Sequence, residues 1–148
     1  MGNNSLLFGL ILGVSLPLFT GQETIIAESE QNITLTCQAI NSNNITVVEW
    51  RRVDLGDEYV LMYRDEQFDP EEQHPSFKNR VDLQDRQMKD GDVSLILKNV
   101  TINDAGTYEC RVAQRQTREE TANLKLLCSI SLSVVDPPAD LRLLLLQR

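Results

Sequence analysis

Short runs of alternating polar and apolar residues follow one another along most of the chain. In the segment NITLTC, residues 32–37, every second residue is apolar, and the segment DVSLILK, residues 92–98, largely repeats this pattern. A period of two residues predicts β-strands with one buried face and one solvated face. No segment keeps a 3.6-residue hydrophobic period over more than two turns, so the sequence does not indicate a long helix.

Five further segments have β-strand character. They combine β-branched and aromatic residues with polar ones, or alternate like the two segments above. Their ranges are 46–53, 58–65, 79–85, 106–113 and 121–135. Residues 65–77 are acidic and contain two prolines, which favours a loop with a short edge strand. Many short strands at this spacing predict an all-β sandwich or barrel.

The cysteines occupy related positions on these predicted strands. Trp50 is the only tryptophan and follows Cys37 by thirteen residues, while Tyr108 precedes Cys110 by two. Cys37 and Cys110 each lie on the apolar parity of their own strand, so we predict a disulfide between them. The third cysteine, Cys128, also has apolar parity, which favours a buried thiol; a bridge to another chain or to a second domain is the alternative.

Composition narrows the classes of function. The chain has 148 residues and a net charge of −8, so it suits one domain and lacks the basic face that nucleic acid requires. It contains a single histidine, His74, and no cluster with metal-ligand spacing. We therefore predict no enzyme activity, no metal site, no cofactor and no small-molecule substrate.

The first residues indicate export. Residues 1–21 contain no charged side chain and have an apolar centre too short to span a membrane, which is typical of a secretory signal. Three glycosylation sequons agree with export and begin at Asn32, Asn44 and Asn99. Residues 137–148 are expected to form a short tail without a membrane span.

The order of these residues carries a family resemblance. Cys37, Trp50 and the Tyr108-x-Cys110 pair resemble the signature of the immunoglobulin fold, and the long middle section resembles its variable type, over residues 22–136. This resemblance implies two antiparallel sheets joined by a disulfide beneath the tryptophan. It also implies that the Tyr108 hydroxyl bonds to nearby backbone at a corner whose tight turn Gly106 permits.

Two segments are similar to a narrower group. Residues 59–83 and 90–112 resemble variable-type domains of the butyrophilin and myelin oligodendrocyte glycoprotein family, which includes T-cell costimulatory and coinhibitory ligands. The resemblance to variable-type domains in general implies an ion pair between Arg80 and Asp104. The narrower resemblance implies a place at the cell surface, or secretion, where such proteins engage lymphocyte receptors. The sequence departs from the family at Glu30, where a glycine is common in the turn before the first cysteine.

The expected partner-binding surface is the outward face of the sheet that holds Trp50 and Cys110. Arginine and tyrosine often dominate protein interfaces, although an ordinary solvated sheet face is the simpler explanation of exposed charges. The candidate residues on the strands are Glu49, Arg51, Tyr63, Glu109 and Arg111, and the loop that follows adds Arg115 and Arg118. Two functions remain open: a ligand that regulates T-cell activation and cytokine production, or an adhesion domain that binds itself or a related molecule.

Overall fold

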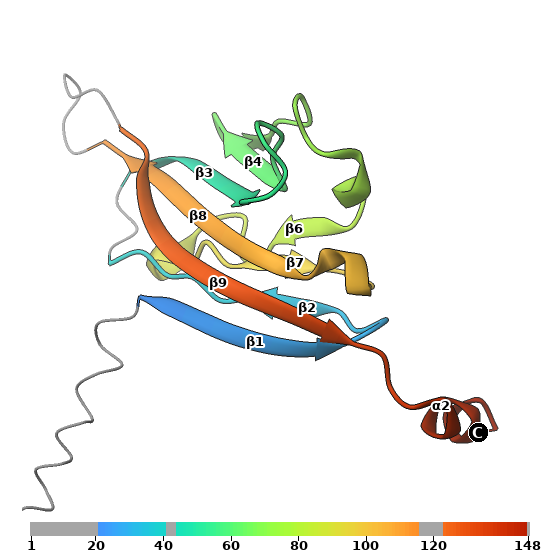
Figure 1. Cartoon of the computed structure of the whole chain (residues 1–148). Helices are drawn as coiled ribbons and strands as arrows, with labels where there is room; N and C mark the ends of the chain where they lie inside the picture. Colours follow the sequence, from blue (N-terminus) through green and yellow to red (C-terminus); the bar gives the residue numbers. More distant parts are fainter. Residues whose placement is uncertain (1–20, 41–43, 116–122, 148) are drawn as a thin grey trace, which may run out of the picture.

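Two β-sheets pack face to face in the computed structural model, which describes residues 21–40, 44–115 and 123–147 (Figure 1). The larger sheet has the strand order β1-β9-β8-β3-β4-β5, and the smaller has the order β2-β7-β6. The strands of the larger sheet, in chain order, are β1 (Gln22–Glu28), β3 (Ile45–Arg52), β4 (Leu61–Arg64), β5 (Gln67–Phe68), β8 (Gly106–Gln114) and β9 (Lys125–Val135). Those of the smaller sheet are β2 (Ile33–Leu35), β6 (Val81–Leu83) and β7 (Leu95–Leu97). The predicted all-β sandwich is confirmed.

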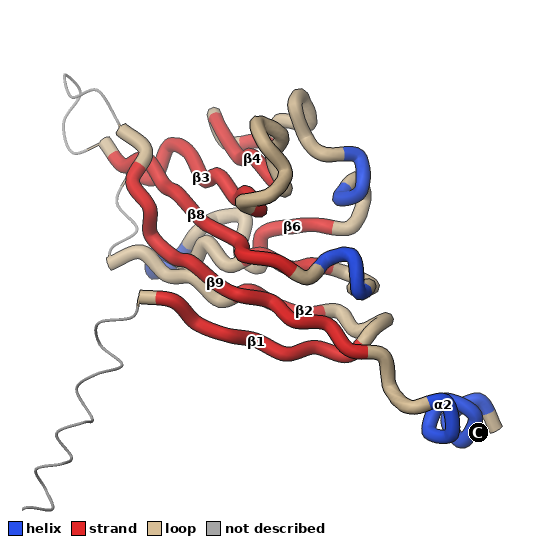
Figure 2. Tube along the Cα trace, viewed as in Figure 1, coloured by secondary structure: helices blue, strands red, loops and turns tan. Residues whose placement is uncertain are grey.

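Strand pairing is antiparallel apart from one pair at the edge. β1 runs parallel to β9, with Gln22 opposite Ser129 and Glu28 opposite Val135. Short helices appear only in the connections and at the C-terminal end of the described chain (Figure 2). They are η2 (Pro75–Phe77), η3 (Lys89–Gly91), η4 (Ile102–Asp104) and α2 (Ala139–Leu146).

The structure describes the predicted C-terminal tail but almost none of the predicted signal. The expected signal, residues 1–21, lies outside the described residues except for Gly21. The expected tail after residue 136 contains α2, a helix that the sequence analysis did not anticipate. None of the helices in the described residues is long and apolar enough to cross a bilayer.

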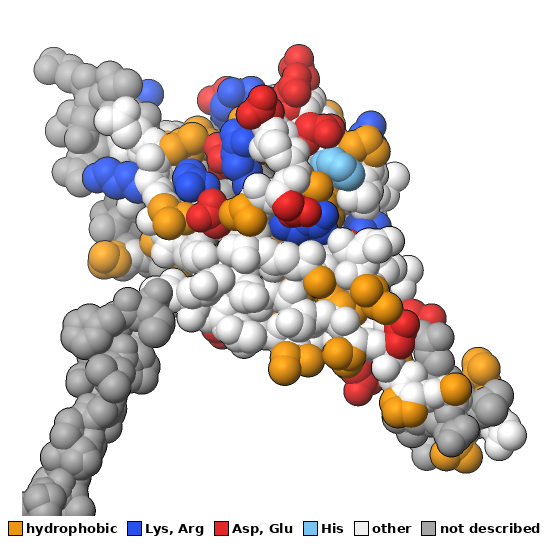
Figure 3. Space-filling view, viewed as in Figure 1, with side chains coloured by type: hydrophobic (Ala, Val, Ile, Leu, Met, Phe, Trp, Pro, Cys, Tyr) orange, Lys and Arg blue, Asp and Glu red, His pale blue; other side chains and the backbone are white. Residues whose placement is uncertain are grey.

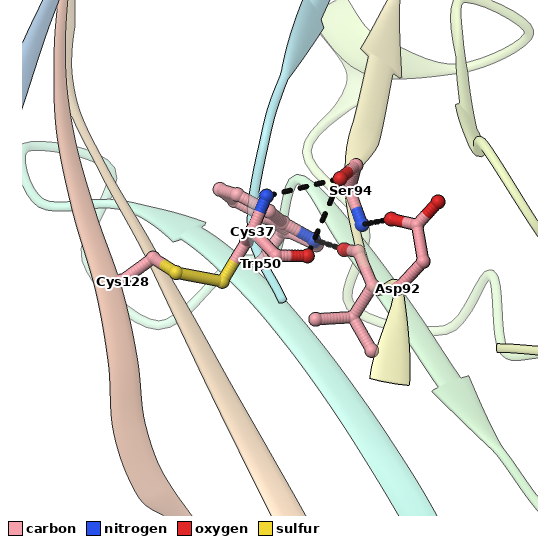
Figure 4. The surroundings of a disulfide bond; sticks show 6 residues. Cys37, Trp50, Asp92, Ser94 and Cys128 are labelled. Atoms are coloured by element: carbon pink, nitrogen blue, oxygen red, sulfur yellow. Dashed lines mark hydrogen bonds between the residues drawn. A yellow bond between two sulfur atoms is a disulfide. The ribbon is translucent and has the colours of Figure 1, made fainter. Parts of the chain in front are cut away.

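Trp50 occupies the centre of the core. Its side chain is completely buried, and its indole Nε1–H donates a hydrogen bond of 2.9 Å to the carbonyl of Val93, just before β7 of the opposite sheet. Beside it, the Ser94 hydroxyl accepts from the Cys37 N–H at 2.9 Å and donates to the Cys37 carbonyl at 3.3 Å (Figure 4). These bonds satisfy buried polar groups that would otherwise destabilise the interior.

A corner at the start of β8 fixes how that strand enters the sheet. The Tyr108 hydroxyl donates a 2.6 Å hydrogen bond to the Asp104 carbonyl, and the Tyr108 ring is fully buried. The Asp104 carboxylate accepts from both terminal nitrogens of Arg80, at 2.5 and 3.2 Å, and from the Thr101 N–H at 2.8 Å. The implied corner and the implied ion pair are thus both present.

Two of the positions with positive φ angles, Gly106 and Glu30, bear on the sequence analysis. Gly106 has a φ of 154°, which side chains rarely adopt, and a Cβ atom there would lie 2.8 Å from Cδ of Arg52, so a larger residue would strain the backbone and displace the Arg52 side chain. Glu30 has a φ of 74°, in the left-handed region that favours glycine. The conformation at residue 30 therefore explains why a glycine is common at this turn in the family that the sequence resembles.

The predicted disulfide partner of Cys37 was wrong. The structure joins Cys37 to Cys128, with Cα atoms 6.0 Å apart, and leaves Cys110 as a buried free thiol. Cys110 and Cys128 lie directly opposite each other on β8 and β9, so both face the same side of the sheet. The alternation along each strand could not show whether Cys110 or Cys128 is the partner of Cys37. That outcome depends on which of the two strands, β8 or β9, brings its cysteine nearer to Cys37 in the folded chain.

A bulge in β9 separates Cys128 from the preceding residues. Cys128 pairs with Cys110, whereas the next pair joins Leu126 to Arg111, which leaves Leu127 without a partner. The bulge reverses the alternation, so Leu126 is 53% exposed although it has the same parity as Cys128. Uninterrupted alternation through residues 121–135 would have placed Leu126 inward together with Cys128, and the bulge turns it outward instead.

The disulfide assignment predicts the result of peptide mapping. Digestion of the oxidised chain without reduction should release a peptide in which Cys37 is linked to Cys128. Cys110 should be alkylated only after unfolding, because burial raises the pKa of the Cys110 thiol.

The same assignment predicts the stability of two variants. Cys110→Ala should lower the free energy of unfolding by about 1 kcal/mol. Cys128→Ala opens a bridge between residues 91 apart and should lower it by about 4–5 kcal/mol in the chain-entropy model. A Cys37–Cys110 peptide from the unmodified chain would contradict the assignment.

The corner predicts an alkaline loss of stability. Burial raises the pKa of Tyr108 to about 12, against the opposing effect of Arg52, whereas a tyrosine in the unfolded chain titrates near about 10. The unfolded state therefore releases its proton first. The contribution of Tyr108 to the free energy of unfolding should be complete below about pH 10 and fall by about 2–3 kcal/mol between about pH 10 and pH 12.

Denaturant titrations across this pH range would measure that loss. Tyr108→Phe should remove most of the alkaline decrease, and it should also lower stability at neutral pH by about 1 kcal/mol through the lost hydrogen bond. Tyr59→Phe is the matched control and should keep the decrease. An equal alkaline decrease in Tyr108→Phe and the unmodified chain would show that another group is responsible.

Candidate interaction face

The outward face of the larger sheet gathers charged side chains from β3 and β8. Strand register places Glu49 between Met62 on β4 and Arg111 on β8, and it places Arg51 opposite Glu109. Because their neighbours Val48, Trp50, Cys110 and Val112 point into the core, these side chains point away from it. Four of the predicted face residues, Glu49, Arg51, Glu109 and Arg111, therefore lie together on one surface.

The charges on this face are paired within each strand. Arg51 Nε lies 2.5 Å from Glu49 Oε1, and Arg111 Nη1 lies 3.1 Å from Glu109 Oε1. Glu49 is only 3% exposed, which is unusual for a carboxylate on the outer surface of a sheet. Burial alone would lower the pKa of the Arg51 guanidinium, but the hydrogen bond and charge attraction of Glu49 outweigh burial and raise it.

Tyr59 adds an aromatic ring to this cluster. The guanidinium carbon of Arg51 lies 4.3 Å from the centre of the Tyr59 ring, within the range of a cation–π contact. The sequence analysis did not identify Tyr59, which lies just before β4. A tyrosine in a segment rich in β-forming residues was the available signal, but the contact with Arg51 depends on the path of the β3–β4 connection.

Tyr63 does not belong to the outward face as expected. It pairs with Val48, is 9% exposed and packs edge-on against Phe68 with ring centres 5.3 Å apart. A four-residue strand offers too few alternations for its parity to be fixed from sequence, and the inward phase places Tyr63 in the core.

Arg115 is exposed just beyond the end of β8, where its N–H donates to the Asn44 carbonyl at 3.0 Å. It therefore lies at one end of the sheet, apart from the charged cluster. Arg118 lies outside the described residues.

The sequons lie away from the charged cluster. Asn32 and Asn99 are exposed and adjacent, since the Asn99 N–H donates to Asn32 Oδ1 at 2.8 Å. Asn44 is exposed at the end of the sandwich and contributes to a groove of about 890 Å³ that Tyr63, Arg86 and Met88 also line. The described residues contain no group of acidic, histidine and cysteine side chains that could hold a metal ion.

Comparison with known proteins agrees with this architecture. The model of the immunoglobulin V-set domain matches residues 20–136. Mouse butyrophilin subfamily 2 member A2 is 32% identical over 135 residues, which cover 83% of this chain and 25% of the mouse protein. The chain thus spans about a quarter of the length of this relative.

Solved structures share the fold at lower identity. The human B7-H4 IgV-like domain superposes with a TM-score of 0.58 at 22% identity, covering 76% of this chain and 91% of that domain. Bovine butyrophilin gives 0.60 at 20% identity, covering 78% of this chain and 52% of that structure. A chain from the complex of ICOS with ICOS-L gives 0.59 at 20% identity, with coverage of 78% and 54%. From the matched V-set model and the two-sheet structure, the chain belongs to the immunoglobulin V-set family.

Proposed function

We propose that this chain is an extracellular binding module that engages a protein receptor on lymphocytes and regulates T-cell activation. The observation that supports this most directly is the cluster of Glu49, Arg51, Tyr59, Glu109 and Arg111 on the outward face of the larger sheet. The similarity to a butyrophilin, and the shared fold with B7-H4 and with a chain of the ICOS–ICOS-L complex, support a receptor-binding role.

The cluster is suited to recognition because its side chains are held in place before binding. Arg51 is fixed by Glu49 on one side and by the Tyr59 ring on the other. Side chains that are already ordered lose less entropy when a partner covers them, so more of the contact energy becomes affinity. Arginine and tyrosine are also the residue types most often found at the energetic centres of interfaces.

Arg111 is the most informative residue to change. Its side chain is 31% exposed and its ion pair with Glu109 lies at the surface, so truncation should leave the fold intact. The guanidinium can meet a carboxylate or a carbonyl of the partner while its stem covers neighbouring apolar surface. We therefore place Arg111 at the centre of the proposed contact.

Staining of lymphocytes tests the proposal. The full chain, secreted as a fusion to a dimeric carrier, should stain resting or activated lymphocytes. Arg111→Ala and Tyr59→Ala should each raise the concentration for half-maximal staining by about tenfold or more, the loss typical of a central interface residue.

Arg86→Ala is the matched control. Arg86 is also paired with a carboxylate at 3.1 Å, that of Asp82, but it lies beside the groove rather than on the outward face. Its staining should equal that of the unmodified chain. Equal loss in Arg86→Ala and Arg111→Ala would contradict the assigned face. Staining confined to cells that display this same domain would contradict the receptor and favour homophilic adhesion.

A further inference from the structure

The fold holds the asparagine of one of the three sequons in place. Asn32 is exposed, and its side-chain oxygen Oδ1 accepts a 2.8 Å hydrogen bond from the backbone N–H of Asn99. Asn32 stands immediately before β2, and the third residue of its sequon, Thr34, lies within that strand. The amide of Asn32 therefore has a defined position beside the smaller sheet.

This hydrogen bond is compatible with glycosylation of the same amide. An N-linked sugar is joined to the nitrogen Nδ2, whereas the N–H of Asn99 contacts the oxygen Oδ1. Attachment replaces one of the two Nδ2 protons and leaves Oδ1 able to accept a hydrogen bond. The folded chain could thus keep the contact with Asn99 while Asn32 carries a glycan, and the contact would restrict rotation of the linkage.

Strand register shows which surface lies next to Asn32. Leu35 of β2 is buried in the core, so Thr34, and with it Asn32 two residues earlier, has the outward parity. Thr34 pairs with Ile96 of β7. Continued by two residues, the same antiparallel register brings Asn32 opposite Lys98, which is exposed. A glycan on Asn32 would therefore begin beside Lys98 and extend over the outward face of the smaller sheet.

The outward face of the smaller sheet has the mixed chemistry that a sugar chain can cover. Its central cross-strand row consists of Thr34, Ile96 and Asp82, all of them half-buried. Sugar hydroxyls can donate to the carboxylate and exchange hydrogen bonds with the threonine. The C–H face of a sugar ring can cover the isoleucine and remove apolar area from water.

We propose that Asn32 carries an N-linked oligosaccharide that covers the outward face of the smaller sheet. The proposal rests on the extracellular location in the proposed function, because such sugars are found on secreted proteins. In the transfer, Nδ2 of Asn32 bonds to the anomeric carbon of an oligosaccharide linked to a lipid diphosphate. The bond from that carbon to the diphosphate oxygen breaks, the lipid diphosphate leaves, and one Nδ2 proton passes to a base.

The glycan leaves the charged cluster uncovered. That cluster lies on the other sheet, and Figure 3 shows charged side chains gathered over β3 and β4. The two broad faces of the sandwich are thus assigned to different tasks, one to the sugar and one to a protein partner.

Peptide mapping of the full chain, secreted from animal cells, tests whether the site is occupied. Treatment with peptide N-glycosidase in heavy-oxygen water should convert Asn32 to labelled aspartate. Thr34→Ser keeps the sequon and should keep the label. Thr34→Val matches threonine in shape but removes the sequon, so it should abolish the label. A secreted chain in which Asn32 remains unlabelled would overturn the proposal.

Acylation of lysine side chains tests whether the glycan covers the predicted face. The comparison uses the Asn99→Asp background, which removes the neighbouring sequon and keeps a short side chain that tolerates the φ of 50° at this position. Lys98 should react several-fold more slowly with Thr34 present than in Thr34→Val, because the glycan begins beside it. Lys125, exposed on β9 of the larger sheet, is the internal control and should react equally in both. Equal rates at Lys98 would overturn the placement.

Lymphocyte staining separates this proposal from the proposed receptor contact. Thr34→Val should stain as strongly as the unsubstituted chain, because the glycan and the charged cluster lie on opposite sheets. Loss of staining in this variant, with thermal unfolding unchanged, would overturn the division of the two faces. A chain that carries the glycan on Asn32 but stains no lymphocytes would contradict the receptor alone and leave the glycan in place.

Discussion

The hydrogen bond from the Tyr108 hydroxyl to the Asp104 carbonyl fixes the start of β8, and the rest of the larger sheet depends on that strand. β8 pairs with β3 on one side and with β9 on the other. A slip of one residue in its register would turn Cys110 outward and Arg111 inward. The Arg80 ion pair to the carboxylate of Asp104 holds the same corner, so the composition of both faces of the sheet depends on it.

The sequence was most informative where many residues of one strand agreed. The alternation in residues 92–98 and 106–113 predicted which side chains form the core, and the order of Cys37, Trp50 and Tyr108 was sufficient to suggest the sandwich. It was least informative where a single residue decided the outcome. The parity of Tyr63 rested on a strand of four residues, and the disulfide rested on the packing of two cysteines that face each other across β8 and β9.

Local backbone geometry and contacts between segments explain the remaining differences. The unpaired Leu127 reverses the alternation of β9, and nothing in the residue types around it marks that position as a bulge. The contact of Tyr59 with Arg51 joins a connection to a strand, so it follows from the folded path of the chain. Both features change which side chains a partner could touch, although neither changes the fold.

The direction of β9 determines the end of the sandwich at which the chain continues beyond Val135. β9 ends at Val135 at one end of the sandwich, whereas β3 begins and β8 ends at the other (Figure 1). At that second end the Arg115 N–H donates to the Asn44 carbonyl. The eleven residues of β9 between these ends span about 36 Å. Any support attached beyond Val135 would thus hold the Asn44 end of the sandwich outermost, with the broad face of the larger sheet turned sideways.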